Sequence, residues 1–135
     1  MSETYPFTHR FRVRYSEVDP QSVVFNARYL DYADLIVTEH WRALDIHFSG
    51  EDAIEFHVVK ALVEFRAPIR ADEEIDGKAR TVRIGNSSVT TEIALYGIDD
   101  APDPRATIEL VHVHVDLGDG KPQPIPASVR ARFAA

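Results

Sequence analysis

The sequence predicts an α+β fold in which a curved antiparallel sheet of five strands wraps around one long helix. Two observations predict this class. One segment of roughly 18 residues has the apolar period of a helix, and five segments have strand patterns. These strands follow one another without the alternation with helices that a parallel sheet requires. An antiparallel sheet must bury one of its faces, and the long helix is the element available to cover it.

The first strand is predicted at His9–Tyr15, where Phe11, Val13 and Tyr15 alternate with three arginines. The helix is predicted from Tyr29 onward, because apolar side chains then recur on one side of a helix over about five turns. These side chains belong to Tyr29, Leu30, Ala33, Ile36, Val37, His40, Trp41 and Leu44, with Tyr32 and Leu35 broadening the stripe. A stripe of this width is typical of a helix that other structure largely encloses.

The chain after Gly50 is predicted to form four more strands and a tail that begins as a proline-rich loop. The strand ranges are Phe56–Arg66, Ile75–Ile84, Ser88–Ile98 and Ala106–Leu117. Two sets of apolar side chains are each predicted to share a face: Val59, Ala61, Val63 and Phe65, and further on Val111, Val113, Val115 and Leu117. One helix cannot cover all of a five-stranded sheet, so an apolar edge or face is expected to stay exposed. We therefore expect a second subunit to cover it.

Length and composition limit the function classes. The 135 residues predict a single domain, residues 1–135, and 44% apolar with 27% charged residues is typical of a globular chain. There is no cysteine, which excludes disulfides, thiolate zinc sites and a cysteine nucleophile. The net charge of -7 argues against nucleic acid or an anionic membrane surface as the main partner.

We expect a cytoplasmic protein that does not associate with a membrane. The first fifteen residues, MSETYPFTHRFRVRY, lack the apolar core of a signal peptide. No apolar run approaches the ~18 residues that a membrane-spanning helix needs.

The connection between the first strand and the helix, VDPQSVVFNARY from Val18 to Tyr29, is the candidate for chemistry. A helix that begins near Asn26 would present free N–H groups and the positive end of its dipole, which can stabilise an oxyanion. Asp19, two residues after Glu17, could act nearby as a general base or as a nucleophile. The simpler interpretation is an Asp-Pro turn followed by an asparagine helix cap. The apolar run Val23–Phe25 argues against it, because it should bury the connection.

Other polar groups offer weaker candidates. His112 and His114 lie on the same face of a predicted strand and could chelate a metal ion, but no third ligand is identifiable. A metal-dependent enzyme is therefore disfavoured. His40 is expected to be a hydrogen-bonded core residue. The helix acids Asp31, Asp34 and Glu39 are expected to face solvent, although one of them could be a second catalytic acid.

Four segments, in order along almost the whole chain, resemble the hot-dog fold acyl-CoA thioesterases of the 4-hydroxybenzoyl-CoA thioesterase type. They are YSEVDPQSVVFNARYLDYAD, VVKALVEFRAPIRADEEI, GNSSVTTEIALY and VDLGDGKPQPIP. The resemblance implies hydrolysis of an acyl-CoA to a free acid and CoA. It implies no cofactor, because coenzyme A is part of the substrate. It also implies a homodimer with active sites at the subunit interface, and a homotetramer is the alternative assembly.

The resemblance also implies roles for individual residues. The family's catalytic aspartate corresponds to Asp19, and the backbone N–H that polarises the thioester carbonyl lies near Asn26. Substrate-binding positions are Phe25, Tyr29 and Arg66. Val59, Lys60 and Ala61 also contribute, from the predicted strand Phe56–Arg66 of a partner subunit. Candidate cations for the CoA phosphates are Arg66, Arg70, Arg83, Arg130 and Arg132.

The chain departs from the family pattern at two positions. Many members have histidine at the position of Asn26, and many have glycine at the position of Ser22, where serine restricts the backbone. Ser22, together with the lack of an identifiable second catalytic group, leaves open an alternative function: a non-catalytic hot-dog protein that binds an acyl thioester or another small ligand.

Overall fold

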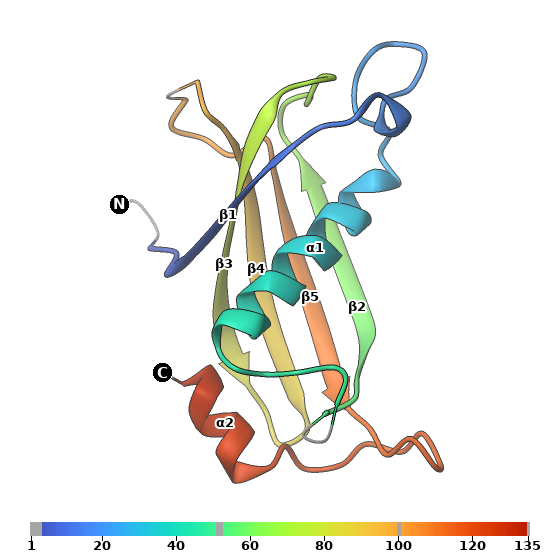
Figure 1. Ribbon diagram of the computed structural model, residues 1–135, viewed down its shortest axis with the longest axis vertical. Coiled ribbons are helices and arrows are strands. Elements are labelled where there is room, and N and C mark those ends of the chain that lie inside the picture. Colours follow the sequence, from blue (N-terminus) through green and yellow to red (C-terminus); the bar gives the residue numbers. More distant parts are fainter. Residues whose placement is uncertain (1–3, 51–52, 100, 135) are drawn as a thin grey trace.

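The computed structural model describes residues 4–50, 53–99 and 101–134, and its strands form one antiparallel sheet crossed by a long helix (Figure 1). The elements are β1 (Phe7–Arg12), a 3-10 turn (Tyr15–Glu17), α1 (Arg28–Ala43), β2 (Phe56–Phe65), β3 (Glu74–Ile84), β4 (Ser88–Gly97), β5 (Ala106–His114) and α2 (Ala127–Phe133). The strand order is β1-β3-β4-β5-β2. The predicted fold class is therefore confirmed.

Helix α1 buries one side against the sheet. Its buried residues are Tyr29, Tyr32, Ala33, Ile36, Val37, His40 and Trp41. The prediction was wrong for Leu30, which is 46% exposed, because it lies at the flank of the stripe in the first turn. The helix has 16 residues and begins at Arg28. No helix among the described residues is long and apolar enough to cross a membrane.

Gly77 in β3 allows α1 to approach the sheet closely. A Cβ atom at this position would overlap the side chain of Ile36, which is fully buried. Because Ile36 is fully buried and protein cores are densely packed, we expect Gly77→Ala to lower the free energy of unfolding by about 1–3 kcal/mol. Urea denaturation measures this change. An unchanged midpoint would show that the helix does not depend on this close approach.

A bulge in β2 changes which of its side chains share a face. Val58 pairs with His112 and Lys60 with Val111, so Val59 is the extra residue. Ala61, Val63 and Phe65 then share a face as predicted, but Val59 falls outside the alternation.

Val111 and Val113 share a face of β5 as predicted, and that face is the outer one. The buried residues of this strand are Ala106, Ile108, Leu110 and His112, whereas Val111 and Val113 lie on the outer face. Because both faces of the strand carry apolar residues, periodicity alone could not separate them. The ring of His112, which contacts Trp41 at 4.7 Å between centroids, takes the inward position.

Helix α2 was missed, since its seven residues follow a proline-rich loop and show a short apolar pattern. Phe133 packs edge-on against Trp41 with 5.2 Å between ring centroids. Arg130 donates to the carbonyl of Gly85, and Arg132 donates to the carbonyl of Asp45. These contacts fix α2 beside the C-terminal end of α1.

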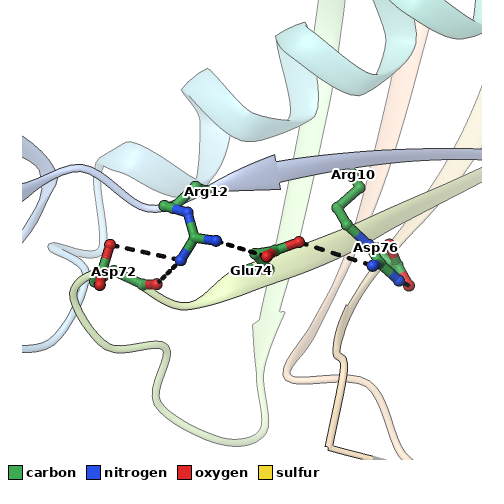
Figure 2. A network of polar contacts seen from close by, with 5 residues as sticks. All are labelled: Arg10, Arg12, Asp72, Glu74 and Asp76. Carbon is green, nitrogen blue, oxygen red and sulfur yellow. Dashed lines mark hydrogen bonds and ion pairs between the residues drawn. The ribbon is translucent and has the colours of Figure 1, made fainter.

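An ion-pair ladder on the outer face fixes the register of β1 on β3 (Figure 2). Arg10 binds both carboxylate oxygens of Asp76, at 2.8 and 3.0 Å, and Arg12 binds Glu74 at 2.6 Å and the carbonyl of Asp72 at 2.7 Å. A slip of one residue would break every pair. β1 therefore holds a fixed position where it leads into the candidate site. Its range also differs from the prediction, because Tyr15 is 80% exposed in the 3-10 turn.

Candidate active site

A tight hairpin holds Asp19. Its N–H donates to the carbonyl of Val23 at 2.9 Å, and the Ser22 N–H donates to the Asp19 carbonyl at 2.9 Å. Asp at the first and Pro at the second position of a turn favour this geometry. One carboxylate oxygen of Asp19 accepts the Gln21 N–H at 2.8 Å, so the side chain has a fixed orientation while it remains half-buried.

Ser22 closes this turn with a φ of 65°, in the left-handed region that favours glycine. The family resemblance placed a glycine here. The hairpin nevertheless forms with serine, so the expected change of loop geometry does not prevent the turn that holds Asp19.

We expect Ser22→Gly to raise the free energy of unfolding by about 0.5–1 kcal/mol, because glycine adopts this φ without the steric cost that serine carries. Chemical denaturation of the two proteins measures the difference. Ser22→Ala is the control: it keeps the strain and should not stabilise. A stabilised alanine variant would contradict the explanation.

The first turn of α1 presents free backbone amides. The helix cap is Ala27 and not Asn26, and no side chain caps the helix. The Phe25 N–H donates to the Glu17 carbonyl at 2.9 Å, and the Arg28 N–H donates to the Phe25 carbonyl at 2.9 Å. Between them, the N–H groups of Asn26 and Ala27 have no acceptor among the described residues. Two neighbouring amides at the positive end of a helix form a site for an oxyanion.

Glu17 anchors the hairpin to the helix. Its side chain is only 9% exposed and accepts hydrogen bonds from the Arg14 backbone at 2.8 Å, the Arg14 guanidinium at 2.9 Å and the Tyr32 hydroxyl at 3.0 Å. Burial acts to raise the pKa of Glu17, but these hydrogen bonds together outweigh it, and the pKa is lowered. Glu17 is therefore an ionised structural group.

A cavity of about 280 Å³ opens beside the start of α1. It is lined by Val23, Val24, Asn26, Tyr29, Phe65, Arg66, Ala67 and Pro68. Tyr29 is buried and meets the ring of Phe65 edge-on at 4.8 Å. Burial raises the pKa of the Tyr29 hydroxyl, against smaller opposing effects of the Arg105 charge and the Ile69 backbone. The structure thus brings Asn26, Tyr29 and Arg66 together.

The other residues predicted to bind substrate do not line this cavity in the single chain. Phe25 is 49% exposed beside it, and Val59, Lys60 and Ala61 lie exposed along β2. Lys60 pairs with Glu109 at 3.0 Å.

The arginines proposed for CoA phosphates separate into two groups. The backbone of Arg70 forms an isolated antiparallel β-bridge with Val23 in the hairpin. Val23 and Arg66 line the same cavity, so Arg70 belongs to the same end of the molecule as Arg66. Arg83 lies near the end of β3, and Arg130 and Arg132 lie on α2, at the other end of the molecule. Of these five arginines, Arg66 and Arg70 are the two placed next to the cavity at the start of α1.

An ion pair behind the cavity was not predicted. Arg105 binds both carboxylate oxygens of Glu73, at 3.1 and 3.0 Å, and donates to the carbonyl of Pro68 at 2.9 Å. Pro68 lines the cavity, so the pair supports its wall. No sequence signal indicated it, because 32 residues separate the two partners.

The two strand histidines point to the core side of β5. His112 is buried, whereas the Nδ1 atom of His114 lies 3.1 Å from the carbonyl oxygen of Pro124. Within the described ranges, no group of three His, Cys, Asp or Glu side chains could hold a metal ion.

Burial of His112 makes stability dependent on pH. Desolvation of the charged ring lowers its pKa to about 4, from 6.5 in an unfolded chain. The stabilisation is therefore complete above pH 6.5 and is lost as the pH falls toward 4. We expect the free energy of unfolding to decrease by about 2–3 kcal/mol over this window from His112 alone. Urea denaturation at several pH values should show a smaller decrease for His112→Phe, and equal decreases would contradict the assignment.

The five-stranded antiparallel sheet crossed by one long helix (Figure 1) is the architecture of the hot-dog class. The chain belongs to the thioesterase-like superfamily, which residues 13–133 match. This confirms the family predicted by resemblance.

Particular relatives support the same placement. The acyl-CoA thioester hydrolase YbgC of Escherichia coli O6:H1 is 28% identical over 126 residues, covering 90% of this chain and 91% of that protein. A thioesterase of Thermus thermophilus, solved with coenzyme A and Zn, is 27% identical with a TM-score of 0.85 over 98% of this chain and 100% of that one. A Pseudomonas aeruginosa protein is 26% identical with a TM-score of 0.86, over 96% and 90% of the two chains.

Proposed function

We propose that this protein is a thioester hydrolase that converts an acyl-CoA to a free acid and CoA at the start of α1. One observation carries the proposal. The hairpin that fixes the Asp19 carboxylate is followed by the start of α1, where the backbone amides of Asn26 and Ala27 are free. Membership of the thioesterase-like superfamily supports the choice of substrate class.

In the proposed reaction, the thioester carbonyl oxygen accepts hydrogen bonds from the Asn26 and Ala27 amides. Asp19 removes a proton from water, and the resulting hydroxide attacks the carbonyl carbon. The tetrahedral oxyanion collapses, the carbon–sulfur bond breaks, and the thiolate of CoA takes the proton that Asp19 removed from water, which regenerates the Asp19 carboxylate. In the alternative route, the Asp19 carboxylate attacks the carbonyl carbon itself, the carbon–sulfur bond breaks and the CoA thiolate leaves. Water then cleaves the resulting anhydride, which releases the acid and restores Asp19.

The acyl group would lie in the cavity that Tyr29 and Phe65 help to line. Its wall is mainly apolar, but it includes Arg66, and Arg70 pairs through its backbone with Val23, another lining residue, so both arginines are candidates for binding phosphate groups of CoA. The asparagine side chain at position 26 can donate or accept a hydrogen bond but does not titrate. Substrate identity is therefore expected to depend on the apolar wall.

We propose a homodimer that pairs two β2 strands. β2 is an edge of the sheet, and its exposed apolar residues include Val58, Val59, Leu62 and Phe65, each between 46% and 62% exposed. A second copy would cover these side chains and extend the sheet. It would also bring Val59, Lys60 and Ala61 of one subunit toward the other, as the family resemblance implies. Sedimentation equilibrium tests the assembly, and a tetramer is the alternative result.

A panel of acyl-CoA and acyl-carrier-protein substrates, assayed with a thiol reagent, tests the function. The proposal predicts release of free thiol by the purified protein, with a preference for some acyl groups. Thermal stabilisation by the same compounds without thiol release would instead identify a non-catalytic binding protein.

A further inference from the structure

A second cavity, of about 700 Å³, lies at the C-terminal end of α1. Its volume is within the range of small-molecule sites. The start of β1, the end of α1, the end of β3 and α2 all contribute to its wall, with apolar side chains from Phe7, Leu44, Ile84 and Phe133. Because α1 has 16 residues, about 24 Å of helix separates this cavity from the amides at the start of α1.

The arrangement of the strands creates this cavity. β1 pairs with β3 only as far as Phe7 opposite Ala79, while β3 continues to Ile84. Pro6 cannot donate a backbone hydrogen bond, which favours the end of pairing there. Among the described residues, no strand therefore pairs with the last part of β3 on the edge where β1 lies, and Phe133 of α2 forms another part of the cavity wall.

Two polar atoms in the wall have no partner. The Nε2 atom of His40, a residue only 4% exposed, and the buried Oγ1 atom of Thr81 make no hydrogen bond within the described part of the chain. Buried polar groups in native proteins are nearly always satisfied. Both residues line the cavity, although these two atoms have almost no accessible surface of their own.

The charge of the wall favours an anion. Although the chain carries a net charge of -7, the described lining contains the cations Arg80 and Arg83 and no Asp or Glu. His40 also lines the cavity but adds no charge near pH 7, because burial lowers its pKa. Arg80 is engaged by Glu92 at 3.2 Å. Arg83 is exposed and forms no ion pair with any described residue, so its guanidinium is available to a carboxylate.

We propose that this cavity is a second ligand site, which binds an amphipathic carboxylate. The apolar body of the ligand lies against Phe7, Leu44 and Phe133, and its carboxylate pairs with Arg83 at the rim. This site does not depend on hydrolysis at the start of α1.

Fluorescence of Trp41 provides the test. It is the single tryptophan of the chain, and its ring contacts Phe133 in the cavity wall. The full-length protein is titrated with octanoate, 1-octanol and octylamine, which share a chain length and differ in charge. We expect a saturable change with octanoate, about tenfold weaker binding of 1-octanol and no binding of octylamine, since the charged contact is lost or reversed.

Two variants locate the binding. Arg83→Gln should weaken octanoate binding about tenfold and leave 1-octanol unchanged. Val82→Phe, at a lining position that is 44% exposed, should abolish both by filling the space. Lys121→Gln removes one positive charge from a loop outside the lining and should change neither. Equal affinities for octanoate and 1-octanol, equal effects of the two charge variants, undiminished binding by Val82→Phe or no saturable response would each overturn the proposal.

Discussion

Replacement of Asp19 by asparagine is expected to lower kcat for acyl-CoA hydrolysis by about 10²- to 10⁴-fold, as for the loss of other general bases. Asparagine has the same shape, and its side-chain oxygen can still accept the Gln21 N–H, so the hairpin should be retained. It cannot remove a proton from water or attack the carbonyl. Steady-state kinetics with the best substrate of the panel measures the loss.

The matched control is Asp34→Asn, which removes one carboxylate from an exposed position of α1. It should change kcat by less than about twofold, because surface substitutions away from a site have small effects. The circular dichroism spectrum and the oligomeric state of both variants should match those of the parent protein. A similar loss of activity in both variants, or near-normal turnover by the Asp19 variant, would rule out Asp19 as the catalytic carboxylate.

Glu17→Ala is expected to lower the free energy of unfolding by about 2–4 kcal/mol. The change removes the acceptor for the Arg14 backbone and guanidinium and leaves the hydroxyl of Tyr32, which is 3% exposed, without its hydrogen bond. Urea denaturation measures the loss. Glu17→Gln keeps one acceptor oxygen and the side-chain volume, so it should lose roughly half as much.

The pH dependence of the stability lost in Glu17→Ala distinguishes the contribution of the Glu17 charge from the contribution of its side-chain packing. Because the pKa of Glu17 is lowered in the folded protein, its ionised form contributes stability above the unfolded value of 4.5. That contribution disappears as the pH falls below 4.5 through the folded pKa. The difference between parent and Glu17→Ala should therefore shrink at low pH. A difference that stays constant down to pH 3 would mean that the carboxylate charge contributes nothing.

The elements of the sheet and the long helix could be predicted from periodicity, because one face of each is buried by its neighbours. Asp19 and Pro20 also indicated a turn, through preferences that act within four residues. Periodicity grouped Val111 with Val113 on one face of β5 but did not tell which face is buried. The packing of His112 against Trp41 decides that.

The support of the site could not be predicted, because it depends on contacts between distant parts of the chain. Glu17 was visible as an acid near Asp19, but its burial depends on Tyr32, 15 residues further along. The helix is capped at Ala27, one residue after the predicted start at Asn26, and no side chain caps it. The free amides of Asn26 and Ala27 could be located only from the hydrogen bonds of the folded chain.

A crystal structure with an acyl-CoA analogue tests the central claim most directly. In the analogue, a methylene group between the carbonyl and the sulfur prevents hydrolysis. We predict that the carbonyl oxygen lies about 2.7–3.1 Å from the amide nitrogen of Asn26 or Ala27, with the Asp19 carboxylate facing the carbonyl carbon. A carbonyl bound elsewhere, with both amides in contact only with water or protein, would contradict the proposed active site.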